Sequence, residues 1–238
     1  MTLEELLAEL RENVLRDISD SVTNDDADRL FSDASLIRYL NDGQVQFAAK
    51  TLCLRDETTP AITRITLVAG QESYDLHPSV KAVFGATIGD RHLSRTRYAA
   101  LTTQRGDLSR GAGVALSGYA CDPLRFYTDR ESGKLGVWPA PGQPLHGAEL
   151  VLRVGRLPLN PLKPNKLTES PEIPEEFHLD IVEWAAYRAL RNHDADAEAL
   201  AKASSHKRRF LEAVDELNRE AKRLLAESVQ FHPNTNWS

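Results

Sequence analysis

Residues 124–141 read LRFYTDRESGKLGVWPAP and decide the fold class of this chain. One β-prone run ends at Tyr127, a polar stretch follows it, and a second apolar run leads to Trp138. Two such runs, joined by a polar stretch that ends in Gly133, predict a β-hairpin whose loop is longer than two residues. The chain therefore contains antiparallel sheet.

The hairpin lies within a long segment that is rich in glycine and proline. Residues 61–170 hold 12 of the 13 glycines and 8 of the 12 prolines. Both residue types punctuate strands and turns and are kept out of helix interiors, so this segment is predicted to be β-rich. Residues 99–121 show no regular period and are expected to form a loop. Further strands are expected at 62–68, 74–76, 80–88 and 150–154.

Two helices are predicted before the β-rich segment. Thr2 and Glu5 have the spacing of a capping box, and leucines recur after them on one helical face. An acidic loop at 19–29 leads to Ser32, which is expected to cap the second helix. Gly43 lies in the middle of that helix, where it marks either close packing or a position without special meaning.

Two more helices are predicted after the proline-rich connector at 160–176. Pro174 opens the first of them, which breaks near His193. The second spans 195–228, and its apolar residues from Leu200 onward alternate in steps of three and four, a heptad pattern that is interrupted only at Lys207.

These patterns predict an α+β fold in which N- and C-terminal helices form a bundle that carries a β-rich insertion. The expected parts are N-terminal helices at 1–60, the insertion with its proline-rich connector at 61–170, a long C-terminal helical hairpin at 171–228 that completes the bundle, and an extended tail at 229–238.

Composition excludes several protein classes. The chain has 238 residues, 41% of them hydrophobic and 27% charged, which is typical of a globular protein. Its net charge of −6 argues against a general nucleic-acid binder. No apolar run is long enough to span a bilayer, and the acidic start does not resemble a signal peptide. Cys53 and Cys121 suit a reducing compartment and exclude a disulfide scaffold.

A search for chemical motifs assigns no catalytic, cofactor-binding or metal-ligating residue. The pair Gly133-Lys134 lacks the first P-loop glycine, where Thr128 stands, and it fits a hairpin turn instead. The seven histidines are dispersed and show no zinc-binding spacing. The sequence therefore favours a protein that binds partners over an enzyme.

Two segments are candidates for partner binding. Arg91, Arg95 and Arg97 lie close together and can contact phosphates or an acidic protein surface, or else form a solvated loop that balances the acidic helices. The tail has Phe231, Pro233 and Trp237 and no charged side chain apart from His232. It is either a docking arm with two aromatic anchors or a frayed terminus.

Several short motifs follow one another along the chain. They are Phe31-Ser32-Asp33, Leu36-Ile37-x-Tyr39-Leu40-Asn41, Tyr74-x-Leu76, Leu135-x-Val137-x-Pro139-x-Pro141, Ile173-Pro174, and Tyr187-x-Ala189-Leu190 with Asp194. Their order resembles that in the head–tail adaptor (connector) proteins of tailed bacteriophages, over residues 1–228. The chain departs from the usual pattern at Phe31, where tryptophan is frequent, and at Gly43, where alanine is commoner.

The resemblance implies a structural protein of the virion neck that assembles in the host cytoplasm and involves no membrane. Such proteins form a homo-oligomeric ring, usually of twelve copies, which binds the portal protein on one side and a tail or nozzle protein on the other. DNA passes through the lumen without specific binding. The alternatives are another neck or tail ring, such as a stopper or tail terminator, an intracellular enzyme with an unrecognised site, and a coiled-coil interaction module.

Overall fold

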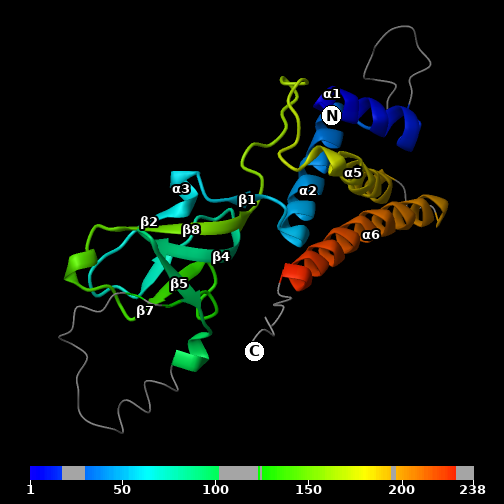
Figure 1. Ribbon diagram of the computed structural model, residues 1–238. Helices are drawn as coiled ribbons and strands as arrows, with labels where there is room; N and C mark the ends of the chain where they lie inside the picture. The colour runs from blue at the N-terminus through cyan, green and yellow to red at the C-terminus, as the bar shows by residue number, and fades with distance from the viewer. Residues whose placement is uncertain (18–29, 102–122, 124, 194–196, 229–238) are drawn as a thin grey trace, which may run out of the picture. The chain divides into compact units, whose positions relative to one another are not determined.

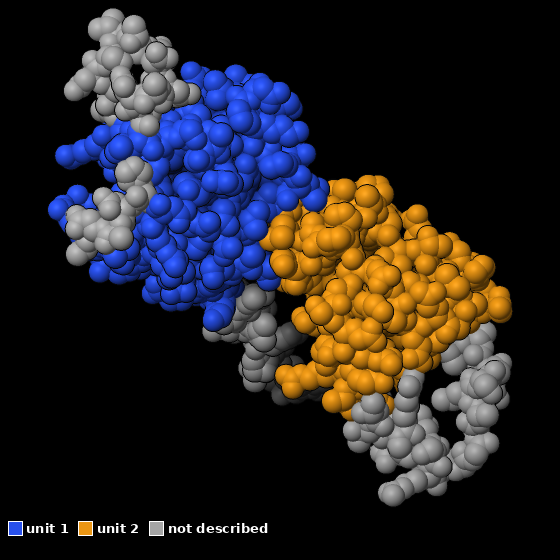
Figure 2. All heavy atoms as spheres, turned by 180° about the vertical axis from the view of Figure 1, so that it is seen from behind, with its two compact units in different colours: residues 1–53, 158–238 blue, residues 54–157 orange. Residues whose placement is uncertain are grey.

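The computed structural model describes residues 1–17, 30–101, 123, 125–193 and 197–228, without the side chains of 193, 197 and 224–228. The chain forms two compact units, unit 1 with residues 1–53 and 158–238 and unit 2 with residues 54–157 (Figure 2). The expected loop at 19–29, most of the segment at 99–121, and the tail with Phe231, Pro233 and Trp237 lie outside the described residues.

Unit 1 is built from helices, several of which begin where the sequence predicts. Thr2 and Glu5 form the expected capping box, and the Ser32 side chain accepts a hydrogen bond from the backbone N–H of Ser35. The helical elements among the described residues of unit 1 are α1 (Leu3–Ala8), the π-helical η1 (Glu9–Leu15), α2 (Asp33–Thr51), the 3-10 turn η5 (Glu175–Phe177), α5 (His178–His193) and α6 (Ala197–Ser228) (Figure 1).

The first helix differs from the regular helix that was expected, because it widens into η1 after Ala8. The Arg11 side chain is buried there and donates to Asp17 Oδ2 at 2.8 Å and to the Phe31 carbonyl at 2.8 Å. It also pairs with Asp33 at the start of α2. A buried guanidinium needs such partners, and together they connect the chain on both sides of residues 18–29.

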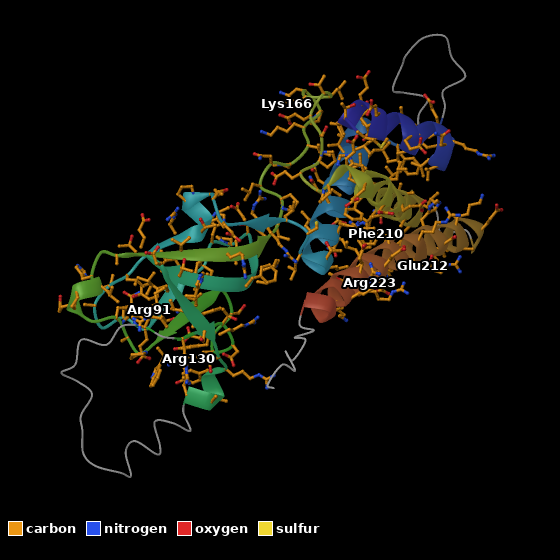
Figure 3. The ribbon with its side chains drawn as sticks, viewed as in Figure 1. Arg91, Arg130, Lys166, Phe210, Glu212 and Arg223 are labelled. Carbon is orange, nitrogen blue, oxygen red and sulfur yellow. The ribbon has the colours of Figure 1, made fainter. Side chains whose placement is uncertain are left out.

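Helix α5 forms the centre of unit 1, since it packs against α2, α6 and η1. Phe47 lies 4.9 Å from Phe177 and 6.0 Å from Phe210, measured between ring centroids, and Trp184 lies 4.8 Å from Phe210. Figure 3 shows Phe210 on α6. This aromatic cluster joins three segments that are far apart in the sequence.

The apolar pattern of α6 is buried only in part. Ala203, Phe210 and Val214 are buried as the pattern predicts, but Leu200 remains 44% exposed, so the prediction is wrong at this end of the helix. Lys207 stands at one of the positions of the apolar pattern. Its ammonium group lies 5.4 Å from the centroid of the Tyr187 ring, which is a cation–π contact.

Residues 158–174 contain no helix or strand and belong to unit 1. The backbone N–H groups of Leu3 and Glu4, which lack partners within α1, donate to the carbonyls of Glu169 and Leu167 at 2.8 and 3.0 Å. The Asn41 side chain exchanges two hydrogen bonds with the backbone of Leu162, at 2.8 and 2.9 Å. These bonds place the connector with the helices.

Unit 2 is a sheet with strand order β1-β8-β4-β5-β6-β7-β3, and β2 also pairs with β8. Only the β5–β6 pair is parallel among the described strands. The strands are β1 (Arg55–Asp56), β2 (Arg64–Thr66), β3 (Ser73–Asp75), β4 (Val80–Ile88), β5 (Arg91–Arg95), β6 (Arg125–Tyr127), β7 (Lys134–Trp138) and β8 (Glu149–Arg156), with the short helices α3 (Pro60–Thr63) and η4 (Gln143–Leu145).

The sheet curls, because β2 pairs with β8 near one end of the strand order and β3 lies at the other end, but the two are joined by residues 67–72 alone. The joining segment is itself bonded to both sides, from Leu67 N–H to the Ala148 carbonyl and from Val137 N–H to the Glu72 carbonyl, each at 2.9 Å. The curled sheet encloses its own core, formed by Ile62, Leu67, Tyr74, Val83, Ala86, Leu93, Phe126, Leu135, Val137, Leu150, Leu152 and Val154.

The predicted hairpin is confirmed as the antiparallel pair β6–β7, in which Phe126 lies opposite Val137. The expectation for Ile62 is wrong, because this residue belongs to α3 and not to a strand. The buried Asp56 carboxylate accepts hydrogen bonds from the backbone N–H groups of Thr58 and Thr59 and thereby fixes the turn that starts α3. The mixed α and β content agrees with the predicted class.

Candidate interaction surfaces

The predicted basic residues lie on and beside β5. Arg95 and Arg97 line an open surface pocket of about 540 Å³, together with Thr96, Thr128 and Asp129. These five residues are hereafter called the arginine pocket.

Arg91 lies at the other end of β5 and does not line the arginine pocket, whereas Arg95 and Arg97 do. The structure therefore brings two of the three predicted arginines together. Arg91 is marked on this unit in Figure 3.

The backbone beneath the arginine pocket is held by main-chain hydrogen bonds. Arg95 pairs with Phe126 in the parallel β5–β6 ladder, and Thr96 N–H donates to the Phe126 carbonyl at 2.9 Å. Asp129 accepts the backbone N–H of Tyr98 at 3.0 and 3.1 Å on its two oxygens. Neither Arg95 nor Arg97 forms an ion pair with any side chain in the described part of the chain. Their guanidinium groups can therefore bind an external anion.

A third arginine lies beside the pocket. The Arg130 guanidinium is 4.8 Å from the centroid of the Tyr98 ring, which lies 5.2 Å from the Tyr127 ring (Figure 3 labels Arg130). A hydrogen bond to Tyr127, and then the charge interaction with Tyr98, raise the pKa of Arg130. Tyr127 in turn lies over Gly136, where an added Cβ would come within 2.1 Å of the ring. This stack supports one side of the pocket.

The chemistry of these groups is that of binding. Guanidinium groups match carboxylates and phosphates through two parallel hydrogen bonds, and threonine hydroxyls can add to them. A pocket of this kind suits an acidic protein surface or a phosphate.

Unit 1 carries a surface of opposite charge, which the sequence analysis missed. Leu179 on α5 is 54% exposed, and Glu176, Asp180 and Glu183 come from its own helix and from the turn before it. Glu216 of α6 is close enough to Asp180 to raise its pKa. These five residues are hereafter called the acidic face.

Two carboxylates of the acidic face differ in their electrostatics. Burial raises the pKa of Asp180 to about 6, and repulsion from Glu183 and Glu216 adds to the rise. Burial also disfavours the charge on Glu183, but contacts with His206 and Arg209, at 2.6 and 3.3 Å, outweigh it and lower the pKa of this group. Glu183 is thus neutralised within unit 1, while Asp180 has no such partner among the described residues.

The sequence indicates only some of the residues of the acidic face. Glu176, Asp180 and Glu183 recur at helical spacing around Leu179, which lies off the apolar stripe of its helix. The contribution of Glu216 depends on the register between α5 and α6, and one sequence does not fix that register.

A second pocket, of about 310 Å³, lies on the sheet of unit 2 across β4, β5 and β8. Phe84 and His92 line it, and so does Arg153, which lies over Gly85 and pairs with Glu57 at 3.7 Å. Arg153 and Glu57 are therefore partnered already, in contrast to the arginines of the arginine pocket.

Within the described residues, no three His, Cys, Asp or Glu side chains gather closely enough to bind a metal ion. In the same part of the chain, no helix combines the length and the apolar character that are needed to cross a membrane.

Comparison with known proteins identifies a family. No curated protein matches the chain. The family model described as "SU10 adaptor protein" matches residues 1–230, which is nearly the whole chain. This match confirms the resemblance to the head–tail adaptors of tailed phages, a structural class of virion proteins. The chain belongs to the SU10 adaptor protein family.

Proposed function

We propose that this chain is a ring-forming adaptor that connects the capsid of a tailed phage to its tail. Copies of the chain assemble beneath the portal around the DNA channel, in a ring of twelve. One side of the ring binds the portal protein and the other binds a tail or nozzle protein. The observation that carries this proposal is the family match over residues 1–230.

The distribution of charge supports assembly of identical copies through unlike surfaces. Unit 2 contains 13 basic and 10 acidic residues and has a net charge of +3, whereas the rest of the chain has 16 and 25 and a net charge of −9. A closed ring of more than two copies needs such a heterologous contact, in which one surface meets a different surface of the next copy.

The overall charge also suits a DNA conduit. Specific or tight DNA binding requires many basic contacts to phosphates, and this chain has a net charge of −6. DNA therefore passes through the lumen of the proposed ring without being held.

The proposal is tested by mixing the purified chain with the portal protein of its own phage. We expect the two proteins to co-sediment, and electron microscopy to show a ring of copies on the portal. A portal protein from an unrelated phage serves as the control and should not co-sediment. If the chain stays monomeric and separate from its own portal under all conditions in which that portal is intact, the proposal is wrong.

In this proposal the tail docks onto the portal or onto a neighbouring copy. Residues 229–238 carry Phe231 and Trp237 and no acidic, lysine or arginine side chain. Burial of one aromatic ring stabilises a complex by about 2–3 kcal/mol, which is enough to hold a short segment against a partner.

Deletion of residues 229–238 should weaken portal binding by about 30-fold or more, the affinity equivalent of one buried aromatic anchor. The double variant Phe231→Ala/Trp237→Ala should reproduce most of this loss, while the matched control Asn234→Ala/Thr235→Ala should bind like the full chain. Dissociation constants from sedimentation measure the effect. Equal affinity of the truncated and full chains would show that the tail is not a docking arm.

A further inference from the structure

The arginine pocket has the features of a contact site for carboxylates. Arg95 and Arg97 are exposed, they project from backbone that β6 holds in place, and they have no acidic partner among the described residues. Asp129, the one carboxylate among the described residues that line the pocket, is already hydrogen-bonded to the backbone of Tyr98. The site thus presents two forked donors with unused capacity.

The acidic face has the complementary features. Glu176 and Glu216 are exposed, and Asp180 lies half-buried near the carboxylates of Glu183 and Glu216, with no cationic partner in the part of the chain that the structure describes. Leu179, 54% exposed, lies among these charges. Carboxylates around an apolar residue can orient a basic partner surface that covers that residue.

We propose that the arginine pocket of one copy binds the acidic face of a second copy. The inference rests on the proposed ring, because it names the two unlike surfaces that neighbouring copies would use. Arg95 and Arg97 would pair with Glu216 and Asp180, and Leu179 would be covered by the partner surface. A contact between two different surfaces of one chain can repeat around a closed ring.

A second copy fits the pocket better than DNA does. A duplex offers a row of phosphates, and proteins that bind it typically make several such contacts. Among the described residues, the arginine pocket supplies two arginines and one carboxylate, which is fewer basic contacts than a duplex-binding surface usually has. The acidic face, in contrast, presents a few carboxylates around a leucine.

The test compares three variants of the full chain in the assembly assay with portal. Arg95→Glu should weaken the association between copies by at least about tenfold, since it brings like charges together. Lys81→Glu, the same charge change at an exposed site of unit 2 outside the pocket, should assemble like the unmodified chain. The charge swap Arg95→Glu/Glu216→Arg should recover most of the lost affinity.

Folding of each variant is checked by its melting temperature, which should not change because all three side chains are exposed. Arg97→Glu is a second variant at the same pocket and should behave like Arg95→Glu.

The outcomes separate this inference from the proposed function. If the unmodified chain forms rings and Arg95→Glu forms them equally well, the inference is overturned and the adaptor function stands. If the unmodified chain forms no ring, both are overturned. If Arg95→Glu leaves the rings intact but abolishes retention of a linear DNA duplex, the pocket binds phosphates and the inference is wrong. If Arg95→Glu weakens the association between copies and the charge swap restores it, the inference is supported.

Discussion

Asp180 shows how one residue couples the stability of unit 1 to pH. Burial, followed by the charges of Glu183 and Glu216, raises its pKa from 3.8 to about 6. The folded state therefore holds this proton more tightly than the unfolded state does. The resulting stabilisation is fully present below pH 3.8 and is lost as the pH rises through 6.

Replacement of Asp180 by asparagine should remove the loss of stability that accompanies deprotonation of Asp180. At pH 7.5 we expect the free energy of unfolding of Asp180→Asn to exceed that of the unmodified chain by about 1 kcal/mol, after allowance for solvent screening of a half-exposed group. The difference should shrink as the pH is lowered from 7 to 4.5. Urea unfolding at several pH values measures it. Asp215→Asn, at an exposed site on α6, is the control and should show no such dependence.

Gly136 gives a prediction for unit 2. The Tyr127 ring occupies the space that a Cβ at Gly136 would need, with its Cζ atom at 2.1 Å, and the ring is buried. Gly136→Ala should therefore destabilise unit 2 by about 1–3 kcal/mol. Gly85→Ala is the matched control on the same sheet, because its Cβ would find only ordinary contacts at 3.6 Å or more. Equal melting temperatures for both variants would contradict this account.

The residues of the two surfaces were predictable to different degrees. Arg95 and Arg97 were found because they are close in sequence and share one strand end, so that the local pattern carries their proximity. Arg91 is only four positions from Arg95, but it lies at the other end of the strand. Asp180 and Glu216 were missed because they are 36 positions apart and meet only through the packing of α5 on α6.

At the level of elements, the contact between α2 and α5 depends on Gly43. A Cβ at this position would lie 3.1 Å from the Ile181 carbonyl oxygen and 3.2 Å from Ile181 Cβ. The adjacent residue, Asp42, accepts hydrogen bonds from Trp184 Nε1 and Arg188 Nη1, both at 2.7 Å. The two helices therefore approach closely, which agrees with the first of the two interpretations that the sequence allowed.

Gly43→Leu should force these helices apart and lower the free energy of unfolding by about 1–3 kcal/mol or more. Ala34→Leu places the same side chain on the exposed surface of α2 and should change stability by no more than about 0.5 kcal/mol. Denaturant unfolding of the two variants provides the comparison. A Gly43→Leu variant as stable as Ala34→Leu would mean that the helices can separate without loss.

Sequence patterns predicted those elements whose signals are local. The capping box at Thr2, the strand at 80–88 and the hairpin β6–β7 each depend on residues a few positions apart, and all three are present. The prediction was wrong for Ile62, whose apolar side chain enters the same core from a short helix. Periodicity reports which side chains are buried, and a four-residue helix is too short to show its own period.

The widened turn η1 illustrates a different limit. Its leucine pattern is that of an ordinary helix, but Arg11, which is not part of that apolar pattern, is buried. Three acceptors stabilise it, namely Asp17, the Phe31 carbonyl and Asp33, and two of them belong to the start of the next helix region. Such a tertiary network leaves no periodic trace in the sequence.

At the scale of the whole molecule, two electrostatic effects of opposite sign act on assembly. Each copy has a net charge of −6, so copies repel one another at long range. The arginine pocket and the acidic face attract at contact distance. Salt screens interactions beyond about 8 Å at 0.15 M ionic strength, so it removes the long-range repulsion first.

Assembly should therefore show an optimum in salt concentration. From low salt to about 0.15 M the association between copies should strengthen as the net repulsion is screened, and towards 1 M, where the screening length is about 3 Å, it should weaken as the contact pairs are screened too. The melting temperature of the single chain should change far less, because its two cores are apolar. Sedimentation and thermal unfolding over the same salt series measure both. In Arg95→Glu the decline at high salt should disappear, since the attraction that salt screens is absent. A steady strengthening of assembly up to 1 M salt in the unmodified chain would mean that apolar burial, and not the arginine pocket, holds the copies together.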